Sequence, residues 1–162
     1  MGVDIHMYLT QFNKKTNKWE EVVLYHKNEE GNIVPIDIFS GRDYELFDIL
    51  SGHENYNFPS SSIHVDSLPD SIKEKLFECE EENGYYGFSQ VNFADLQLYL
   101  AHHPLVRDYD WEDENTFEQQ AWKDSPLKQL VERIKWILTL DDKWWAGITY
   151  DSDIKLIYWF DR

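Results

Sequence analysis

Apolar and polar residues alternate through the beginning of the chain. The apolar positions are Val3, Ile5, Met7 and Leu9, and the positions between them are Asp4, His6, Tyr8 and Thr10. Successive side chains of a β-strand point to opposite faces, so this alternation predicts a strand whose two faces differ in polarity. A polar turn over residues 13–18 and a second strand over residues 19–26 complete a predicted hairpin.

Helical signals replace this alternation in the middle of the chain. Helices are predicted over residues 43–50, 70–82, 93–102 and 125–138. Asn92 is expected to cap the third of these helices, and Ser125-Pro126 to begin the fourth. The fourth is the clearest, because its apolar residues recur every three or four positions. They are Leu127, Leu130, Val131, Ile134, Ile137 and Leu138.

Strands are predicted again at the end of the chain, over residues 144–150 and 154–160 around a turn at residues 151–153. Pro35 makes residues 33–36 an edge strand or its end, and residues 53–62 form a predicted loop. The order of strands, helices and strands predicts an α+β fold. We expect an antiparallel sheet built from the N- and C-terminal strands, with several helices packed on one face. The length of 162 residues suits one domain, residues 1–162.

Several classes of protein are excluded by what the sequence lacks. No apolar run approaches the ~18 residues of a transmembrane helix. Cys79 is the only cysteine, which excludes an internal disulfide and a cysteine-rich zinc site. Neither a Gly-x-Ser-x-Gly motif nor a glycine-rich phosphate loop occurs. We therefore expect a cytoplasmic protein without a self-contained enzyme signature.

The charge of the chain is high and uneven. Thirty-one acidic residues against fifteen basic ones give a net charge of −16. Between Leu76 and Trp122 there are eleven acidic residues and one basic residue, Arg107, so this stretch carries more than half of the net charge. Such a potential repels nucleic acids and membranes and attracts basic protein surfaces. The alternative is an acidic protein whose charge serves solubility alone.

The most acidic stretch also contains aromatic residues. It consists of Asp108, Tyr109, Asp110, Trp111, Glu112, Asp113 and Glu114. Aromatic rings are frequent anchors of protein interfaces, and carboxylates pair with the arginines and lysines of a partner. These residues are the predicted partner-binding epitope. The alternative is an exposed loop whose rings fold back onto the core.

Asp4 and His6 are the one local pair with a chemical signal. Being two residues apart on a predicted strand, they lie on the same face. Imidazole and carboxylate groups are ligands of zinc and similar divalent metals. A third ligand is needed, and Asp161 of the last strand would reach the same rim if the terminal strands are neighbours. The alternative is a solvated face on which Asp4 and His6 form hydrogen bonds. The other five histidines are expected to be surface residues.

Three segments carry a family resemblance: Met1-Gly2-Val3-Asp4-Ile5-His6, Arg42-Asp43-Tyr44-Glu45-Leu46-Phe47 and Tyr158-Trp159-Phe160-Asp161. They resemble a family of small proteins encoded by bacteriophages and prophages, which begin with Met-Gly-x-Asp-Ile-His and end with a Trp-Phe-Asp strand. Many relatives have a histidine-serine segment before the third helix, where this chain has Tyr86-Gly87-Phe88-Ser89. The resemblance falls on Asp4, His6 and Asp161 together, which favours the metal hypothesis.

Phage origin, small size and acidity are similar to those of inhibitors of bacterial defence. These include type II-A anti-CRISPR proteins, some of which look like metal-containing Cas9 inhibitors. The resemblance therefore implies a phage protein that docks on a basic, nucleic-acid-handling host enzyme such as Cas9, with a structural zinc or similar ion. No direct contact with nucleic acid or membrane is expected. The alternative function is a metal-dependent hydrolase or phosphoesterase that uses the Asp-x-His site.

Overall fold

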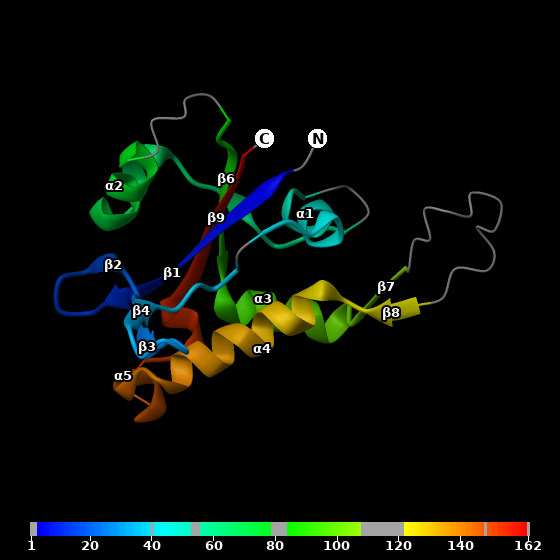
Figure 1. Ribbon diagram of the computed structural model, residues 1–162. Coiled ribbons are helices and arrows are strands. Elements are labelled where there is room, and N and C mark those ends of the chain that lie inside the picture. The colour runs from blue at the N-terminus through cyan, green and yellow to red at the C-terminus, as the bar shows by residue number, and fades with distance from the viewer. Residues whose placement is uncertain are drawn as a thin grey trace.

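The computed structural model describes residues 3–39, 41–52, 56–78, 84–107, 122–147 and 149–161 (Figure 1). In chain order its elements are β1 (Asp4–Asn13), β2 (Lys18–Glu21), β3 (Tyr25–Lys27), β4 (Ile33–Pro35), α1 (Tyr44–Leu50), β5 (Ser61–Ser62), the 3₁₀ turn η1 (Val65–Ser67), α2 (Asp70–Glu78), β6 (Tyr86–Asn92), α3 (Phe93–His102), β7 (Leu105–Arg107), β8 (Trp122–Asp124), α4 (Pro126–Thr139), α5 (Asp142–Trp145), the 3₁₀ turn η3 (Asp151–Asp153) and β9 (Ile154–Asp161).

The main sheet has five strands in the order β2-β1-β9-β6-β5, and every neighbouring pair is antiparallel. The two terminal strands, β1 and β9, pair along their whole overlap, from Asp4 opposite Asp161 to Gln11 opposite Ile154. Strand β9 lies in the centre because it is apolar on both faces. The predicted α+β fold, with a sheet built from both ends of the chain, is confirmed.

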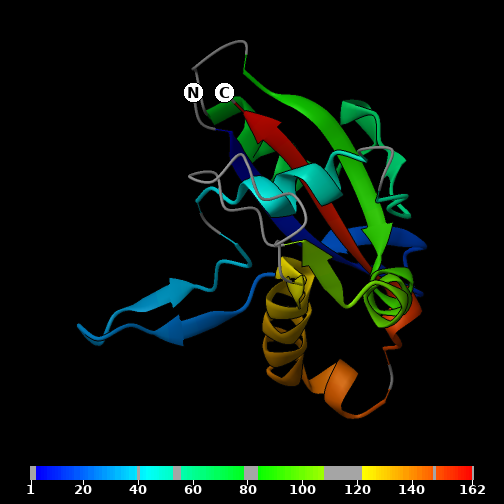
Figure 2. The ribbon, with the colours of Figure 1, turned by 90° about the vertical axis from the view of Figure 1, so that its right-hand side faces the viewer.

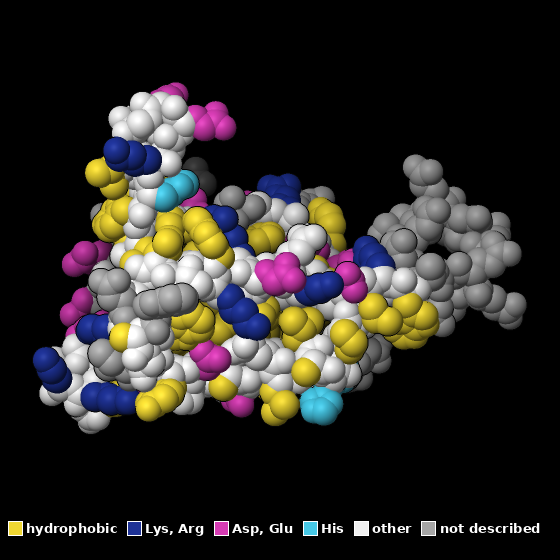
Figure 3. Space-filling view, turned by 90° about the horizontal axis from the view of Figure 1, so that it is seen from below, with side chains coloured by type: hydrophobic (Ala, Val, Ile, Leu, Met, Phe, Trp, Pro, Cys, Tyr) yellow, Lys and Arg dark blue, Asp and Glu magenta, His cyan; other side chains and the backbone are white. Residues whose placement is uncertain are grey.

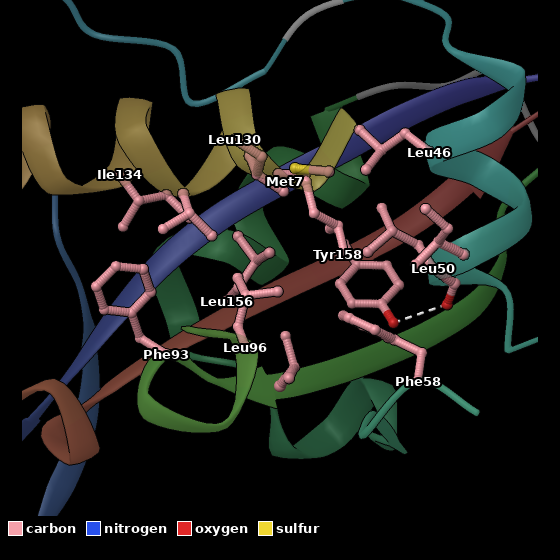
Figure 4. Close-up of a cluster of buried hydrophobic side chains, with 14 of the residues drawn as sticks. Met7, Leu46, Leu50, Phe58, Phe93, Leu96, Leu130, Ile134, Leu156 and Tyr158 are labelled. Carbon is pink, nitrogen blue, oxygen red and sulfur yellow. Dashed lines mark hydrogen bonds between the residues drawn. The ribbon is translucent and has the colours of Figure 1, made fainter. Parts of the chain in front are cut away.

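Helices α1, α3 and α4 cover one face of this sheet and form the larger core with it (Figure 2). Figure 4 shows side chains of β1, β9 and these helices pointing toward one another, among them Met7, Leu156 and Leu130. Helix α2 lies on the opposite face, where Leu68 and Ile72 pack against Ile157 and Trp159. Because successive residues of β9 face opposite sides, the same strand contributes to both cores.

The helix starts follow the predicted caps. The Asn92 side chain accepts a hydrogen bond from the Ala94 amide at 2.9 Å, and the Ser125 hydroxyl accepts one from the Leu127 amide at 3.3 Å. Each bond satisfies a backbone donor that has no partner within the first turn of the helix. The predicted positions of these two helices are therefore confirmed.

The predicted strand over residues 144–150 is wrong. Asp142–Trp145 is a short helix, and Gly147, whose φ is +72°, ends the turn that follows by donating to the Trp144 carbonyl at 3.0 Å. The Trp144 indole N–H also donates to the Asp151 carboxylate at 2.9 Å. These local hydrogen bonds hold the segment out of the sheet.

Strand β6, which the sequence did not indicate, lies next to β9 on the side away from β1. Strand β6 pairs with β9 and contains an irregularity between Tyr86 and Ser89, where Gly87 has a φ of +69°. A Cβ at Gly87 would lie 2.7 Å from the Phe160 ring, so the bend admits only glycine there without movement of the neighbouring ring. Strand β5 likewise lies within the predicted loop over residues 53–62.

The predicted strand over residues 19–26 is divided between two sheets. Strand β2 belongs to the main sheet, whereas β3 pairs with β4 in a separate two-stranded hairpin that projects from the body (Figure 2). In the part of the chain that the structure describes, no helix is long and apolar enough to cross a membrane.

Tyr158 is a polar residue within the main core. Its hydroxyl donates to the Leu50 carbonyl at 2.8 Å, the bond drawn in Figure 4. Burial raises the pKa of Tyr158 to about 12, because the phenolate would lose its hydration in the core. The hydrogen bond thus ties the end of α1 to the central strand.

We expect Tyr158→Phe to lower the free energy of unfolding by about 1–3 kcal/mol at neutral pH, because the Leu50 carbonyl loses its donor. The wild type should also lose stability above pH 10, the ordinary pKa of tyrosine, and up to about pH 12, since the folded state resists ionisation of Tyr158. The variant lacks this contribution. Urea unfolding across the alkaline range measures both effects, and equal alkaline sensitivity of the two proteins would contradict the assignment.

Candidate functional site

The register of β1 and β9 brings the three predicted metal ligands to one edge of the sheet. Asp4 lies directly opposite Asp161, and His6 is opposite Trp159. Side chains of directly opposed residues point to the same face, and so do those of residues two apart on one strand. Asp4, His6 and Asp161 therefore share a face, as the sequence predicted. Together with Arg42 they are called the terminal-strand site below.

His6 and Asp161 form a direct pair. The His6 Nε2 atom lies 2.7 Å from Asp161 Oδ2, and the two side chains are 32% and 23% exposed. This distance is typical of a hydrogen bond with an ionised partner. This side-chain bond joins β1 and β9 at the end of the strand pair, in addition to their backbone pairing.

Asp4 has a different partner, Arg42, whose Nε donates to Asp4 Oδ1 at 2.6 Å. The hydrogen bond from Arg42 holds the pKa of Asp4 below its usual value, and the same contact raises the pKa of Arg42. The loop before α1 is brought to this position by a backbone bond of 3.4 Å from the Ile5 amide to the Gly41 carbonyl.

Two carboxylates that face each other across a strand pair repel each other. Here each of them has its own nitrogen partner, Arg42 for Asp4 and His6 for Asp161. Arg42 is not among the predicted ligands, although it begins one of the three segments that carry the family resemblance. No spacing rule joins residues 38 positions apart, so only the folded structure reveals the contact.

Aromatic rings form the inner wall of the site. The His6 ring stacks on Trp159 at 5.8 Å between centroids, and Tyr85 meets it edge-on at 5.7 Å. Trp159 is buried, and its indole N–H has no hydrogen-bond partner among the described residues. The rings fix the plane of the imidazole, which orients His6 toward Asp161.

The donor atoms suit a divalent metal, but their arrangement is that of a hydrogen-bonded cluster. Two tetrahedral zinc ligands lie about 3.3 Å apart when each is about 2.0 Å from the ion, whereas His6 and Asp161 are in direct contact. Among the described residues, no group of three or more His, Cys, Asp or Glu is placed to hold a metal ion. Arg42 already binds the Oδ1 atom of Asp4, and a metal site formed by Asp4, His6 and Asp161 stays a prediction.

The predicted partner-binding residues, Asp108 to Glu114, lie outside the described residues. The structure does describe the two strands that flank this segment. Strands β7 and β8 pair with each other, and Arg107 is opposite Trp122, so the described residues on either side of residues 108–121 lie side by side. Leu105 and Trp122 share the outer face of this ribbon and are 46% and 59% exposed, while Val106 on the other face is buried.

Comparison with known proteins adds no relative. No protein-family model matches the chain, and neither a curated protein nor a solved structure gives a significant match. The resemblance to small phage proteins therefore stays a prediction.

Replacement of Arg42 tests the electrostatic role of the terminal-strand site. The pKa of Asp4 is lower in the folded protein than its ordinary value of 3.8, so the ionised carboxylate stabilises the fold at pH values above 3.8. This contribution is lost as the pH falls through the lower pKa of the folded state. We expect Arg42→Gln to be less stable than the wild type at neutral pH, with the difference shrinking in acid. Urea unfolding between neutral pH and about pH 2 measures this.

Arg133→Gln is the matched control, because Arg133 donates to a backbone carbonyl, that of Asp37, and to no recorded carboxylate among the described residues. Its effect on stability should not vary with pH over the same range. A pH-independent difference for Arg42→Gln as well would contradict the proposed role of the Asp4 contact.

Proposed function

We propose that this protein is an acidic binding protein of phage origin, which inhibits a nucleic-acid-handling host enzyme in the cytoplasm. Guide-RNA-loaded Cas9 is the candidate partner. The observation that carries the proposal is the uneven charge, with more than half of the net −16 between Leu76 and Trp122. Cas9-type effectors hold their heteroduplex in a positively charged channel, which an acidic domain can occupy.

The distribution of the described charges supports this assignment of the binding surface. On the face that contains α4, Figure 3 shows Lys and Arg interspersed with Asp and Glu, so no patch of one sign covers the described part of that face. Several lysines and arginines are also paired within the protein, as Lys123 is with Glu45 at 2.7 Å. More than half of the acidic surplus lies between Leu76 and Trp122, the stretch that contains residues 108–114.

Exposed apolar side chains of the β7–β8 ribbon also support the proposal. Leu105 and Trp122 are exposed at the base of the acidic segment, and a solvent-exposed tryptophan is a frequent anchor of an interface. The ribbon lies at one extremity of the molecule, beyond α3 and α4 (Figure 1). A partner can approach it without contact with the sheet.

Charge reversal tests the epitope. Changing Asp110, Glu112, Asp113 and Glu114 to Lys should slow association with guide-RNA-loaded Cas9, by an amount that shrinks as salt rises, because steering depends on unscreened charge. Trp111→Ala should instead speed dissociation, since a buried anchor acts mainly on the off-rate. Surface plasmon resonance at several ionic strengths separates the two rates.

The matched control reverses four exposed acidic residues elsewhere: Glu29, Glu30, Glu74 and Glu132. It changes the net charge by the same amount. If both sets of reversals slow association equally, the acidic segment is not the epitope. If neither set of reversals nor Trp111→Ala alters binding, or if no binding occurs, the proposed function is wrong.

The convergence of Asp4, His6 and Asp161 on one face favours a second candidate function, a metal-dependent hydrolase or phosphoesterase. Under the leading proposal, the same metal is structural and ties the terminal strands together. Elemental analysis of protein purified without added metal should then find about one zinc or similar ion per chain. His6→Ala and Asp4→Ala should lose the ion, while Arg42→Gln, which frees Asp4, should retain it.

A folded wild-type protein that binds its partner without stoichiometric metal would contradict the metal site. Hydrolysis of phosphodiesters or peptides distinguishes the two functions. Robust turnover that disappears in His6→Ala, with an unchanged circular dichroism spectrum, would favour the hydrolase.

A further inference from the structure

Among the described elements, half of strand β1 has no strand beside it on the side away from β9. Strand β2 pairs with β1 only from Thr10 to Asn13, and one more backbone bond, 2.9 Å from the Val22 amide to the Leu9 carbonyl, continues this contact. The next recorded backbone contact on this side is the bond from the Ile5 amide to Gly41. Between these two points lies a groove of about 470 Å³, which is called the β1 groove below.

The floor of the β1 groove contains backbone groups that have no recorded partner among the described residues. Backbone N–H and C=O groups of alternate residues in a strand point to the same side, so those of Met7 point the same way as those of Ile5 and Leu9. For Ile5 and Leu9 this is the side away from β9. Among the described residues, no backbone partner outside the sheet is recorded for Met7. A donor and an acceptor therefore face the groove.

The two sides of the groove differ in polarity. Toward the larger core its lining is apolar and includes Ile36, Ile38 and Ile137. Toward the other face of the sheet it is polar and includes Asp4, His6, Glu21 and Lys75. A strand added at this edge alternates its side chains between the same two faces.

Carboxylates predominate among the charged groups of the groove. Asp4, Glu21 and Asp37 line it, against Lys75 as the one lysine or arginine in that lining. Glu21 is paired with Lys75, and Asp4 with Arg42. Asp37 is exposed, and Arg133 binds its backbone carbonyl, not its carboxylate. The groove therefore favours a positively charged occupant.

We propose that the β1 groove binds an extended segment of the protein partner, in which apolar and basic residues alternate. The segment pairs with the backbone of Met7 as an added strand, with its apolar side chains toward Ile36 and Ile38. Its basic side chains pair with Asp37, the carboxylate of the lining for which no ion pair is recorded among the described residues. Residues 5 to 9 span ~13 Å, which accommodates about four residues of an extended chain. This inference rests on the proposed function, since it specifies a segment of the same basic partner.

Strand addition is a known mode of peptide recognition, in which backbone hydrogen bonds provide affinity and alternate side chains provide specificity. A probe is an acetylated peptide of alternating valine and lysine. It should bind the full chain in calorimetry and slow hydrogen exchange at the Met7 amide, measured by NMR. Two comparison peptides should bind at least about tenfold more weakly: alternating valine and glutamate, and the same valines and lysines arranged in two blocks.

Val23→Trp is the variant that fills the groove, because Val23 lines it and is 38% exposed. It should weaken binding of the valine–lysine peptide at least about tenfold. Tyr25→Trp is the matched control, since Tyr25 is 60% exposed and lies outside the groove lining. Unchanged Met7 exchange at saturating peptide, equal binding of the glutamate peptide, or equal effects of the two variants would each overturn the proposal.

The two proposals fail separately. If the protein binds guide-RNA-loaded Cas9 through its acidic segment, but Val23→Trp leaves both that binding and peptide binding unchanged, the groove inference alone is wrong. If the valine–lysine peptide protects Met7 while Cas9 is not bound, the partner assignment alone is wrong.

Discussion

The pairing of β1 with β9 is the interaction on which the rest of the structure depends. It joins the two ends of the chain from Asp4–Asp161 to Gln11–Ile154. Closing so long a loop has an entropic cost that grows only slowly with loop length. Burial of β9 on both faces offsets this cost, because Ile154 and the run from Leu156 to Phe160 are buried. The helices then pack on faces that this strand pair has created.

The same pairing explains the composition of the terminal-strand site. It places two carboxylates opposite each other, and each is held by a nitrogen donor, Arg42 for Asp4 and His6 for Asp161. Like charges at directly opposed positions destabilise a sheet unless they are compensated. The guanidinium group provides to Asp4 what a metal ion would otherwise provide, a positive charge within hydrogen-bonding distance.

The two regions that we propose for a basic partner would act for different physical reasons. The β7–β8 ribbon has exposed apolar side chains and is joined in sequence to the acidic segment, so it favours long-range attraction followed by anchoring. The β1 groove combines carboxylates with backbone groups that have no recorded partner among the described residues, so it favours a segment in one extended conformation. The first depends on charge carried by the sequence, whereas the second depends on an unfilled position in the sheet.

The sequence by itself determined the elements whose signals are local. The alternation in β1, the apolar spacing of α4 and the caps at Asn92 and Ser125 each depend on residues a few positions apart, and the structure confirms them. It also determined that Asp4 and His6 share a face. Only the tertiary structure decided that β6 enters the sheet and that Arg42 holds Asp4. These outcomes depend on contacts between residues far apart in the chain, where packing and hydrogen bonding override local propensity.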